Sequence, residues 1–138
     1  MFFFGILRIL NTNKDKVELS EYTIQEENMK EIYNVLQSLG IHRTYKGYYY
    51  VAEAVRLVMK DASLLLYISK SLYPAIARVY DTTISCVERN IRTVITSCWE
   101  SEYMSQLEMI AGVRLYKKPT SGEFIDILAN YLNSQCES

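Results

Sequence analysis

The chain has few of the side chains that bind metal ions or form covalent cross-links. Its 138 residues include three cysteines, Cys86, Cys98 and Cys136, and one histidine, His42. No two cysteines form a C-x-x-C pair and an odd number leaves one over, so the sequence argues against a zinc site and against a disulfide framework. We therefore expect no metal and no cofactor, and a reducing cytoplasm fits this cysteine content best.

Motifs that would indicate an enzyme are also missing. The five glycines are scattered along the chain, and none belongs to a glycine-rich phosphate loop. The sequence has no nucleophile elbow and no cluster of residues suited to acid–base chemistry. His42 is more typical of a loop or of the edge of a DNA interface than of a catalyst. The sequence thus predicts a protein that is not an enzyme.

Long hydrophobic runs are absent except at the start of the chain. Residues 1–10 are mostly apolar, but they are too few to span a bilayer. They also lack the early positive charges and the small-residue cleavage site of a signal peptide, and Arg8 interrupts them. We expect no membrane partner.

The first 22 residues are expected to form a segment separate from a domain over residues 23–138. Residues 2–10 and 16–23 flank a polar stretch and alternate as strands do, so we predict a short β-hairpin. Because an isolated hairpin is marginal in water and its edge can pair with another strand, we expect this segment to form a homodimer. The alternatives are that it folds back onto the helical domain or is partly helical.

Net charge supports nucleic-acid binding only when it is divided along the chain. The whole chain carries a net charge of −1. Residues 1–39 contain 4 basic and 6 acidic side chains, whereas residues 42–118 contain 11 basic and 7 acidic ones. The second stretch therefore has the basic excess that phosphate contacts require. The excess is modest, so we expect weak binding by a monomer and a strong dependence on salt.

The same stretch carries the pattern of a helix-turn-helix DNA reader. A first helix over residues 64–79 has apolar side chains at helical spacing, and Pro74 predicts that it is bent or divided. After a turn at residues 80–83, a second helix gathers apolar residues on one face, which are Val87, Ile91, Val94, Ile95 and Cys98. Its other face is polar and consists of Ser85, Glu88, Arg89, Arg92 and Thr96. Two arginines and a carboxylate match the groups that read guanine and cytosine in the major groove, although arginines on a helix face are often only solvated.

The start of the second helix is open to two interpretations. Asp81, Thr82 or Thr83 can cap it, and Ser85-x-x-Glu88 has the spacing of a capping box. If Glu88 took part in a cap, its base-reading role would be lost.

Four further helices are predicted from apolar periodicity and from start and stop signals. They cover residues 23–39, 47–60, 103–111 and 120–133. Gly40 and Gly112 are expected to end two of them. The tyrosines at positions 45 and 48–50 are expected to pack at a helix start rather than to stack on bases.

Several longer motifs carry a resemblance to a known family. They are Gly40-Ile41-His42-Arg43-Thr44-Tyr45-Lys46-Gly47-Tyr48-Tyr49-Tyr50, Leu72-Tyr73-Pro74-x-Ile76-Ala77, Thr82-Thr83-x-Ser85-x-Val87-Glu88-Arg89-x-Ile91-Arg92 and Lys118-Pro119-Thr120-x-x-Glu123-Phe124-Ile125. From about residue 23 to residue 133 the chain resembles the effector domain of the master regulator of endospore formation, stage zero sporulation protein A. The resemblance implies a mainly α fold of six helices that binds a TGTCGAA-like box in double-stranded DNA and contacts the RNA polymerase sigma factor.

The resemblance also assigns roles to residues of the second helix. It implies that Glu88, Arg89 and Arg92 read bases. Cys86 stands where the family usually has an arginine and Thr93 where it usually has a histidine, so affinity or sequence preference is expected to differ. The expected supporting or phosphate-contacting residues are Ser85, Cys86, Thr93 and Thr96 on the helix and Arg43, Lys46, Lys117 and Lys118 in flanking loops.

Two functions remain open at this point. The family's regulators carry a receiver domain with a phosphorylatable aspartate, and 138 residues cannot hold one beside this domain, so we expect no phosphorylation input. The chain is either a sequence-specific transcriptional regulator or an interaction protein that pairs with a full-length regulator or the polymerase and antagonises it. The departures at Cys86 and Thr93 favour the second function. We favour the first, because a pure interaction protein has little reason to keep base-reading side chains.

Overall fold

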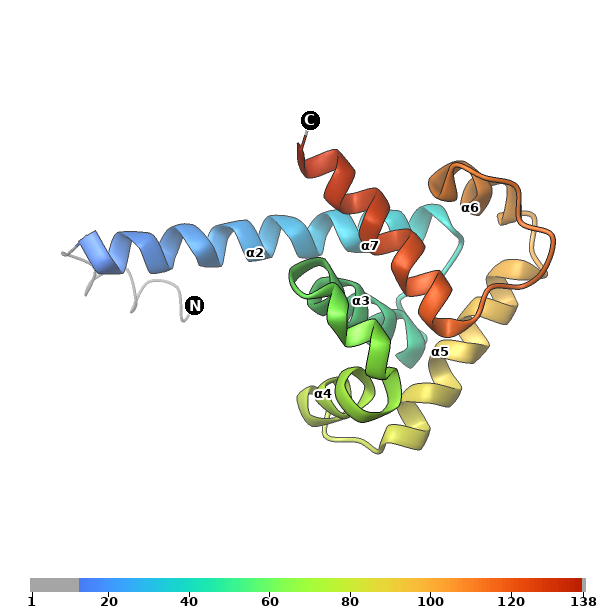
Figure 1. The fold of residues 1–138 in the computed structure, drawn as a ribbon, viewed down its shortest axis with the longest axis horizontal. Coiled ribbons are helices and arrows are strands. Elements are labelled where there is room, and N and C mark those ends of the chain that lie inside the picture. Colours follow the sequence, from blue (N-terminus) through green and yellow to red (C-terminus); the bar gives the residue numbers. More distant parts are fainter. Residues whose placement is uncertain (1–12, 138) are drawn as a thin grey trace.

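The computed structural model describes the backbone of residues 13–137 and the side chains of residues 26–135. Every regular element within these residues is a helix, as Figure 1 shows. The expected mainly α fold is therefore confirmed. None of the described helices combines the length and the hydrophobicity that crossing a bilayer demands.

The first described element, α2, is one continuous helix over Asn13–Ser38. It corrects our prediction for the N-terminal segment, because residues 16–23, expected as the second strand of a hairpin, are helical. The expected boundary after residue 22 falls inside the same helix. Residues 2–10, the expected first strand, lie outside the described residues.

Local propensity explains why α2 begins so early. The sequence has no glycine or proline between Gly5 and Gly40, and residues 13–31 contain three lysines and five glutamates, which favour helices. The alternation of Val17 and Leu19 with polar neighbours, which suggested a strand, is too short to compete with this propensity. Gly40 follows the helix with a φ of 75°, a left-handed conformation typical of a glycine at a helix end.

The remaining elements follow in chain order. They are α3 (Lys46–Lys60), the 3₁₀ helix η1 (Ala62–Tyr67), the π-helical η2 (Ile68–Leu72), α4 (Tyr73–Val79), α5 (Ile84–Trp99), α6 (Met104–Ala111) and α7 (Ser121–Glu137). The helices predicted to start near residues 47, 103 and 120 are confirmed as α3, α6 and α7. The last of these continues past its predicted end at residue 133.

The helix predicted over residues 64–79 is divided, as the position of its proline indicated. The 3₁₀ and π-helical turns come first, and α4 then begins with Pro74 in its first turn. Proline has no N–H group, and the N–H groups of a first turn have no partner within the helix, so this residue fits the start of α4 and not its interior.

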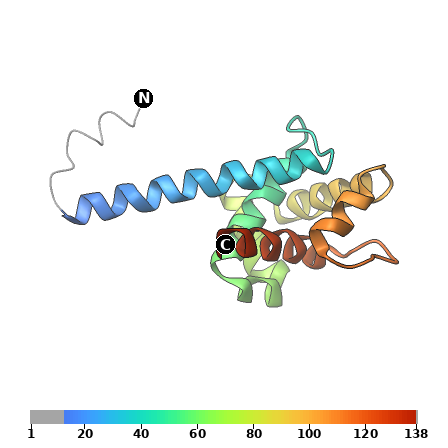
Figure 2. The same ribbon diagram turned by 90° about the horizontal axis from the view of Figure 1, so that it is seen from above.

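The core forms around α3, which packs against α2, α5 and α7. Its fully buried large side chains come from most of the described helices and include Ile32, Leu36, Val51, Val55, Ile91, Leu107, Phe124, Ile125 and Leu128. Figures 1 and 2 show that the N-terminal half of α2 lies outside this body and projects beyond the other described helices.

Candidate nucleic-acid interface

Helices α4 and α5 pack together and form the predicted helix-turn-helix. In the turn between them Asp81 has a φ of 49°, a left-handed conformation that aspartate adopts more readily than most residues. The N–H of Thr82 donates to the carbonyl oxygen of Ala77 over 2.9 Å. Ala77 is itself buried, so the turn is tied to the core on its α4 side.

The start of α5 resolves the two cap interpretations. The hydroxyl oxygen of Thr83 accepts a hydrogen bond from the N–H of Cys86 over 3.1 Å, so Thr83 is the N-cap. The spacing of Ser85 and Glu88 is not used as a capping box. Instead the carboxylate of Glu88 accepts a hydrogen bond from Arg92, one turn further along the helix.

The two faces of α5 differ as the sequence predicted. The inner face is buried in the core and consists of Val87, Ile91, Val94, Ile95 and Cys98. On the outer face Ser85, Arg89, Arg92 and Thr93 are exposed, and Glu88 and Thr96 are partly exposed. The inner contacts fix the helix, so its outer side chains are presented to solvent from a rigid support.

Glu88 and Arg92 form an ion pair on that outer face. The guanidinium Nη2 lies 2.5 Å from Oε1, and the side chains are 61% exposed for Arg92 and 44% exposed for Glu88. A pair this exposed contributes about 0–1 kcal/mol to stability. Its main effect is to hold a cation and a carboxylate side by side next to the exposed Arg89.

Two cations from other parts of the chain flank α5. The Lys118 ammonium, from the loop before α7, donates to the hydroxyl of Thr96 over 3.1 Å. At the other side, a Cβ at Gly47 would lie 2.5 Å from the carbonyl oxygen of Asn90, so only glycine lets the start of α3 approach α5 this closely. This approach places the exposed Lys46 beside the N-terminal half of α5.

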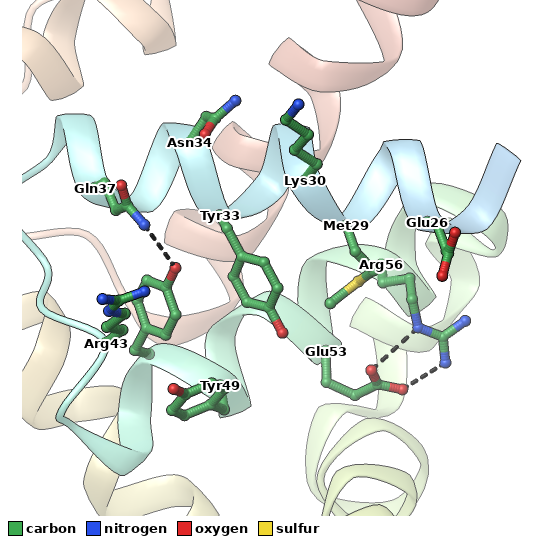
Figure 3. Close-up of a pocket in the computed structure, with 11 residues that line it drawn as sticks. Glu26, Met29, Lys30, Tyr33, Asn34, Gln37, Arg43, Tyr49, Glu53 and Arg56 are labelled. Atoms are coloured by element: carbon green, nitrogen blue, oxygen red, sulfur yellow. Dashed lines mark hydrogen bonds and ion pairs between the residues drawn. The ribbon is translucent and has the colours of Figure 1, made fainter. Parts of the chain in front are cut away.

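No contact among the described residues places the other two predicted phosphate-binding residues, Lys117 and Arg43, beside α5. Lys117 is exposed in the same loop as Lys118. Arg43 lines a groove between α2 and α3, where Figure 3 shows it near Gln37, so it is not brought to α5 with the other cations.

Residues 32–132 match the family model described as sporulation initiation factor Spo0A C terminal. The matched region runs from the second half of α2 into α7 and includes the whole helix-turn-helix. The chain belongs to this family. Spo0A C-terminal domains are DNA-binding effector domains that regulate transcription, and they are not a class of enzymes. The resemblance drawn from the motifs is therefore confirmed, and the chain is a DNA-binding regulator.

In this Spo0A C-terminal domain, Cys86 has a polar environment at the start of α5. A hydrogen bond from Thr82 lowers the pKa of its thiol, and the Tyr50 hydroxyl and the nearby Lys46 and Arg89 act in the same direction. The tyrosine oxygen lies 3.9 Å from Sγ. Cys86 therefore presents, at the start of α5, a thiol whose pKa lies below its ordinary value.

The structure adds two contacts to Cys86, from Asn90 and Tyr50, that sequence reasoning did not foresee. The Asn90 side chain donates to the carbonyl oxygen of Cys86 over 2.7 Å and lies 3.4 Å from its sulfur. Tyr50 is buried and joins α3 to the same sulfur, which agrees with the packing role predicted for the tyrosine cluster. The spacing of four residues between Cys86 and Asn90 was a usable signal, whereas the approach of Tyr50 depends on tertiary packing.

Proposed function

We propose that this domain reads a TGTCGAA-like box in the major groove through Glu88, Arg89 and Arg92. The observation that carries the proposal is the outer face of α5, where both guanidinium groups and the carboxylate are presented within about one turn of each other. Arginine donates two hydrogen bonds to guanine, and a carboxylate accepts one from cytosine. Both bases occur in the proposed box.

The remaining polar groups near α5 would position the duplex. Lys46 and Lys118 flank the helix and can contact phosphates on its two sides, with Lys117 as a neighbour of the second. On α5 itself, Ser85 and Thr96 offer hydroxyl groups near the DNA, and Cys86 and Thr93 occupy the positions where the family usually supplies charge or a donor. Phosphate contacts set register and affinity, whereas base contacts set sequence preference. Such contacts take place in the cytoplasm, where we expect the protein to meet its DNA.

Two protein partners complete the proposal. The domain binds DNA as a homodimer, because its basic excess is too small for a monomer to bind DNA tightly.

The domain also contacts the RNA polymerase sigma factor. A surface suited to a protein partner lies at the end of α6 and just beyond. There Met109, Val113 and Tyr116 are 75%, 62% and 88% exposed. Met109 and Val113 line one shallow depression, and exposed apolar groups that lie together are typical of protein–protein contacts.

A second function has one specific observation in its favour. The Thr93 hydroxyl donates to the carbonyl oxygen of Arg89 over 2.9 Å, within its own helix. The position that usually carries a histidine thus offers DNA a short side chain already engaged with the backbone. An interaction protein that antagonises a full-length regulator would tolerate such a loss.

A binding assay separates the two functions. We compare the wild-type chain and Arg89→Ala on box DNA and on a scrambled duplex in a gel shift. Loss of a paired guanine contact is expected to cost about 1–3 kcal/mol on the box and much less on the scrambled duplex. Lys60→Ala is the matched control, because it removes one positive charge at the far end of α3, about 20 Å from the end that approaches α5. No preference for the box in the wild type would favour the interaction protein, and equal losses on both duplexes would reassign Arg89 to phosphate contact.

A further inference from the structure

A groove lies between α2 and α3, on a part of the surface that the proposed DNA contacts do not use. Its volume is about 810 Å³. Figure 3 shows α2 along one side, with Glu26 near one end and Gln37 near the other. The eleven steps from Glu26 to Gln37 rise about 17 Å along the helix.

The floor of the groove is aromatic. Tyr33 and Tyr49 are partly buried and form its surface, and the buried Tyr48 supports them from below. The rings of Tyr33 and Tyr48 are stacked, with centroids 5.1 Å apart and an angle of 12° between their planes. The ring of Tyr49 meets the Tyr48 ring edge-on, with centroids 5.0 Å apart. Met29 extends the apolar surface and is only partly buried. Aromatic surfaces of this kind favour aromatic side chains as partners.

Polar groups surround this floor, and several already have partners. Gln37 donates to the hydroxyl of Tyr48 over 3.2 Å. The carboxylate of Glu53, which is almost fully buried, is held by Arg56 through contacts of 3.1 and 2.5 Å. Lys30 and Asn34 line the α2 side as well. The groove therefore offers an apolar floor and a rim that can bond to the backbone of a peptide.

One stretch of the chain has the composition to fill this groove. Residues 1–10 contain three consecutive phenylalanines, Phe2, Phe3 and Phe4, and the single charge of Arg8. The 12 residues that precede α2 span between about 18 Å as a helix and about 40 Å when extended, so they cover the length of the groove in either form.

We infer that the groove between α2 and α3 binds residues 1–10 of a second copy of this chain, with the phenylalanines on its tyrosine floor. The inference deepens the homodimer part of the proposed function and rests on it. The exchange is reciprocal, because a twofold dimer places the same segment of each copy in the groove of the other.

The projection of α2 favours a second copy, and not the same chain, as the source of the segment that fills the groove. The helix carries Asn13 about 20 Å beyond Glu26, away from its own groove. To reach the groove of the same chain, residues 1–10 would have to reverse direction after Asn13 and run back about 20 Å along α2. If two copies instead lie with their projecting halves side by side and antiparallel, Asn13 of one copy comes opposite Glu26 of the other. The segment then enters the second copy's groove directly, and the two projecting halves cover each other.

Sedimentation of the full chain tests this inference. We compare the wild type, the segment variant F2S/F3S/F4S and the groove variant Met29→Lys, with Leu66→Lys as the control at an equally apolar and exposed position in η1. The wild type and the control are expected to be dimers, and the segment and groove variants to dissociate at least about tenfold more readily. Since Met29 touches the core, thermal unfolding checks its variant, and Asn34→Trp, at an exposed position on the groove rim, blocks the groove without a core change.

A cross-link shows which copy supplies the segment. One chain carries Phe4→Cys and another carries Asn34→Cys, both with the native cysteines replaced by alanine. Oxidation of the mixture is expected to give a species of double mass. A monomeric wild type, a dimer that persists in the segment and groove variants, or a mixture without the cross-linked pair would overturn the inference. DNA reading by α5 would stand in each case, because the Arg89→Ala gel shift tests it separately.

Discussion

The hydroxyl of Tyr50 on α3 lies 3.9 Å from the sulfur of Cys86 in the first turn of α5. Together with the hydrogen bond from Thr82, this contact stabilises the thiolate and lowers the thiol pKa. Cys98, on the inner face of the same helix, has the opposite environment, because burial raises the pKa of its thiol to about 11. The two faces of α5 therefore differ in chemical reactivity as well as in exposure.

We predict that iodoacetamide modifies Cys86 long before Cys98. The thiolate is the reactive form, so the rate at Cys86 should reach half its maximum at a pH below the ordinary cysteine value of about 8.5. Mass spectrometry of a Cys136→Ser variant at a series of pH values measures both rates, and Thr82→Val should move the Cys86 midpoint upward. Equal rates at the two cysteines in the folded protein would contradict the structure.

The close approach of α3 and α5 gives a second prediction. A methyl group at Gly47 would lie 2.4 Å from a Val94 methyl and 2.5 Å from the Asn90 carbonyl oxygen, and the backbone atom cannot move aside cheaply. Gly47→Ala should therefore reduce the free energy of unfolding by about 1–3 kcal/mol.

Gly122 in α7 provides the control for that substitution. Its nearest neighbour for an added methyl group is the end of the Ile68 side chain at 3.9 Å, so there is room. Gly122→Ala should leave stability unchanged or raise it by about 0.5–1 kcal/mol, because alanine favours a helix. Urea denaturation measures both variants, and similar losses in the two would show that α3 and α5 are not in close contact.

Sequence reasoning located α5 and its two faces well, because helical periodicity is a local property. All five residues predicted for the inner face are buried, and the cap falls at Thr83, one of the three residues proposed for it. The division of the helix at Pro74 could also be predicted from the sequence, since proline acts through its own ring and its missing N–H.

The parts that sequence reasoning missed have other physical causes. At the start of α2, the short alternation around Val17 predicts a strand, but the long run of helix-favouring residues around it determines the structure. The contact between Tyr50 and Cys86 and the place of Arg43 in the groove depend on how α2, α3 and α5 pack, which no local pattern contains. Tertiary contacts of this kind required the structure.

Lys118 allows a test of phosphate contact. Its hydrogen bond to Thr96 holds the ammonium group beside the outer face of α5. We expect Lys118→Ala to weaken binding to box and scrambled DNA by similar factors and to reduce the slope of log affinity against log salt by about 1. Lys70→Ala, an exposed lysine in η2, should leave the slope unchanged. A loss confined to the box would instead mean that Lys118 contacts a base.

The ion pair between Glu88 and Arg92 leads to the last prediction, in which stability and specificity should separate. Because the pair is exposed, Glu88→Gln should change the free energy of unfolding by less than about 1 kcal/mol. The same change replaces a group that only accepts hydrogen bonds with an amide that also donates. If the carboxylate reads cytosine, the preference at that base pair should fall by about 1–3 kcal/mol.

Binding to duplexes that vary one base pair of the box at a time measures this preference. Glu100→Gln removes the same charge from an exposed position just after the end of α5, about 18 Å along the helix from Glu88. It should leave every base preference intact while making non-specific binding slightly stronger, because a repulsion toward phosphate is lost. Identical preferences in wild type and Glu88→Gln would remove Glu88 from the base-reading set, and the proposed function would then depend on Arg89 and Arg92 alone.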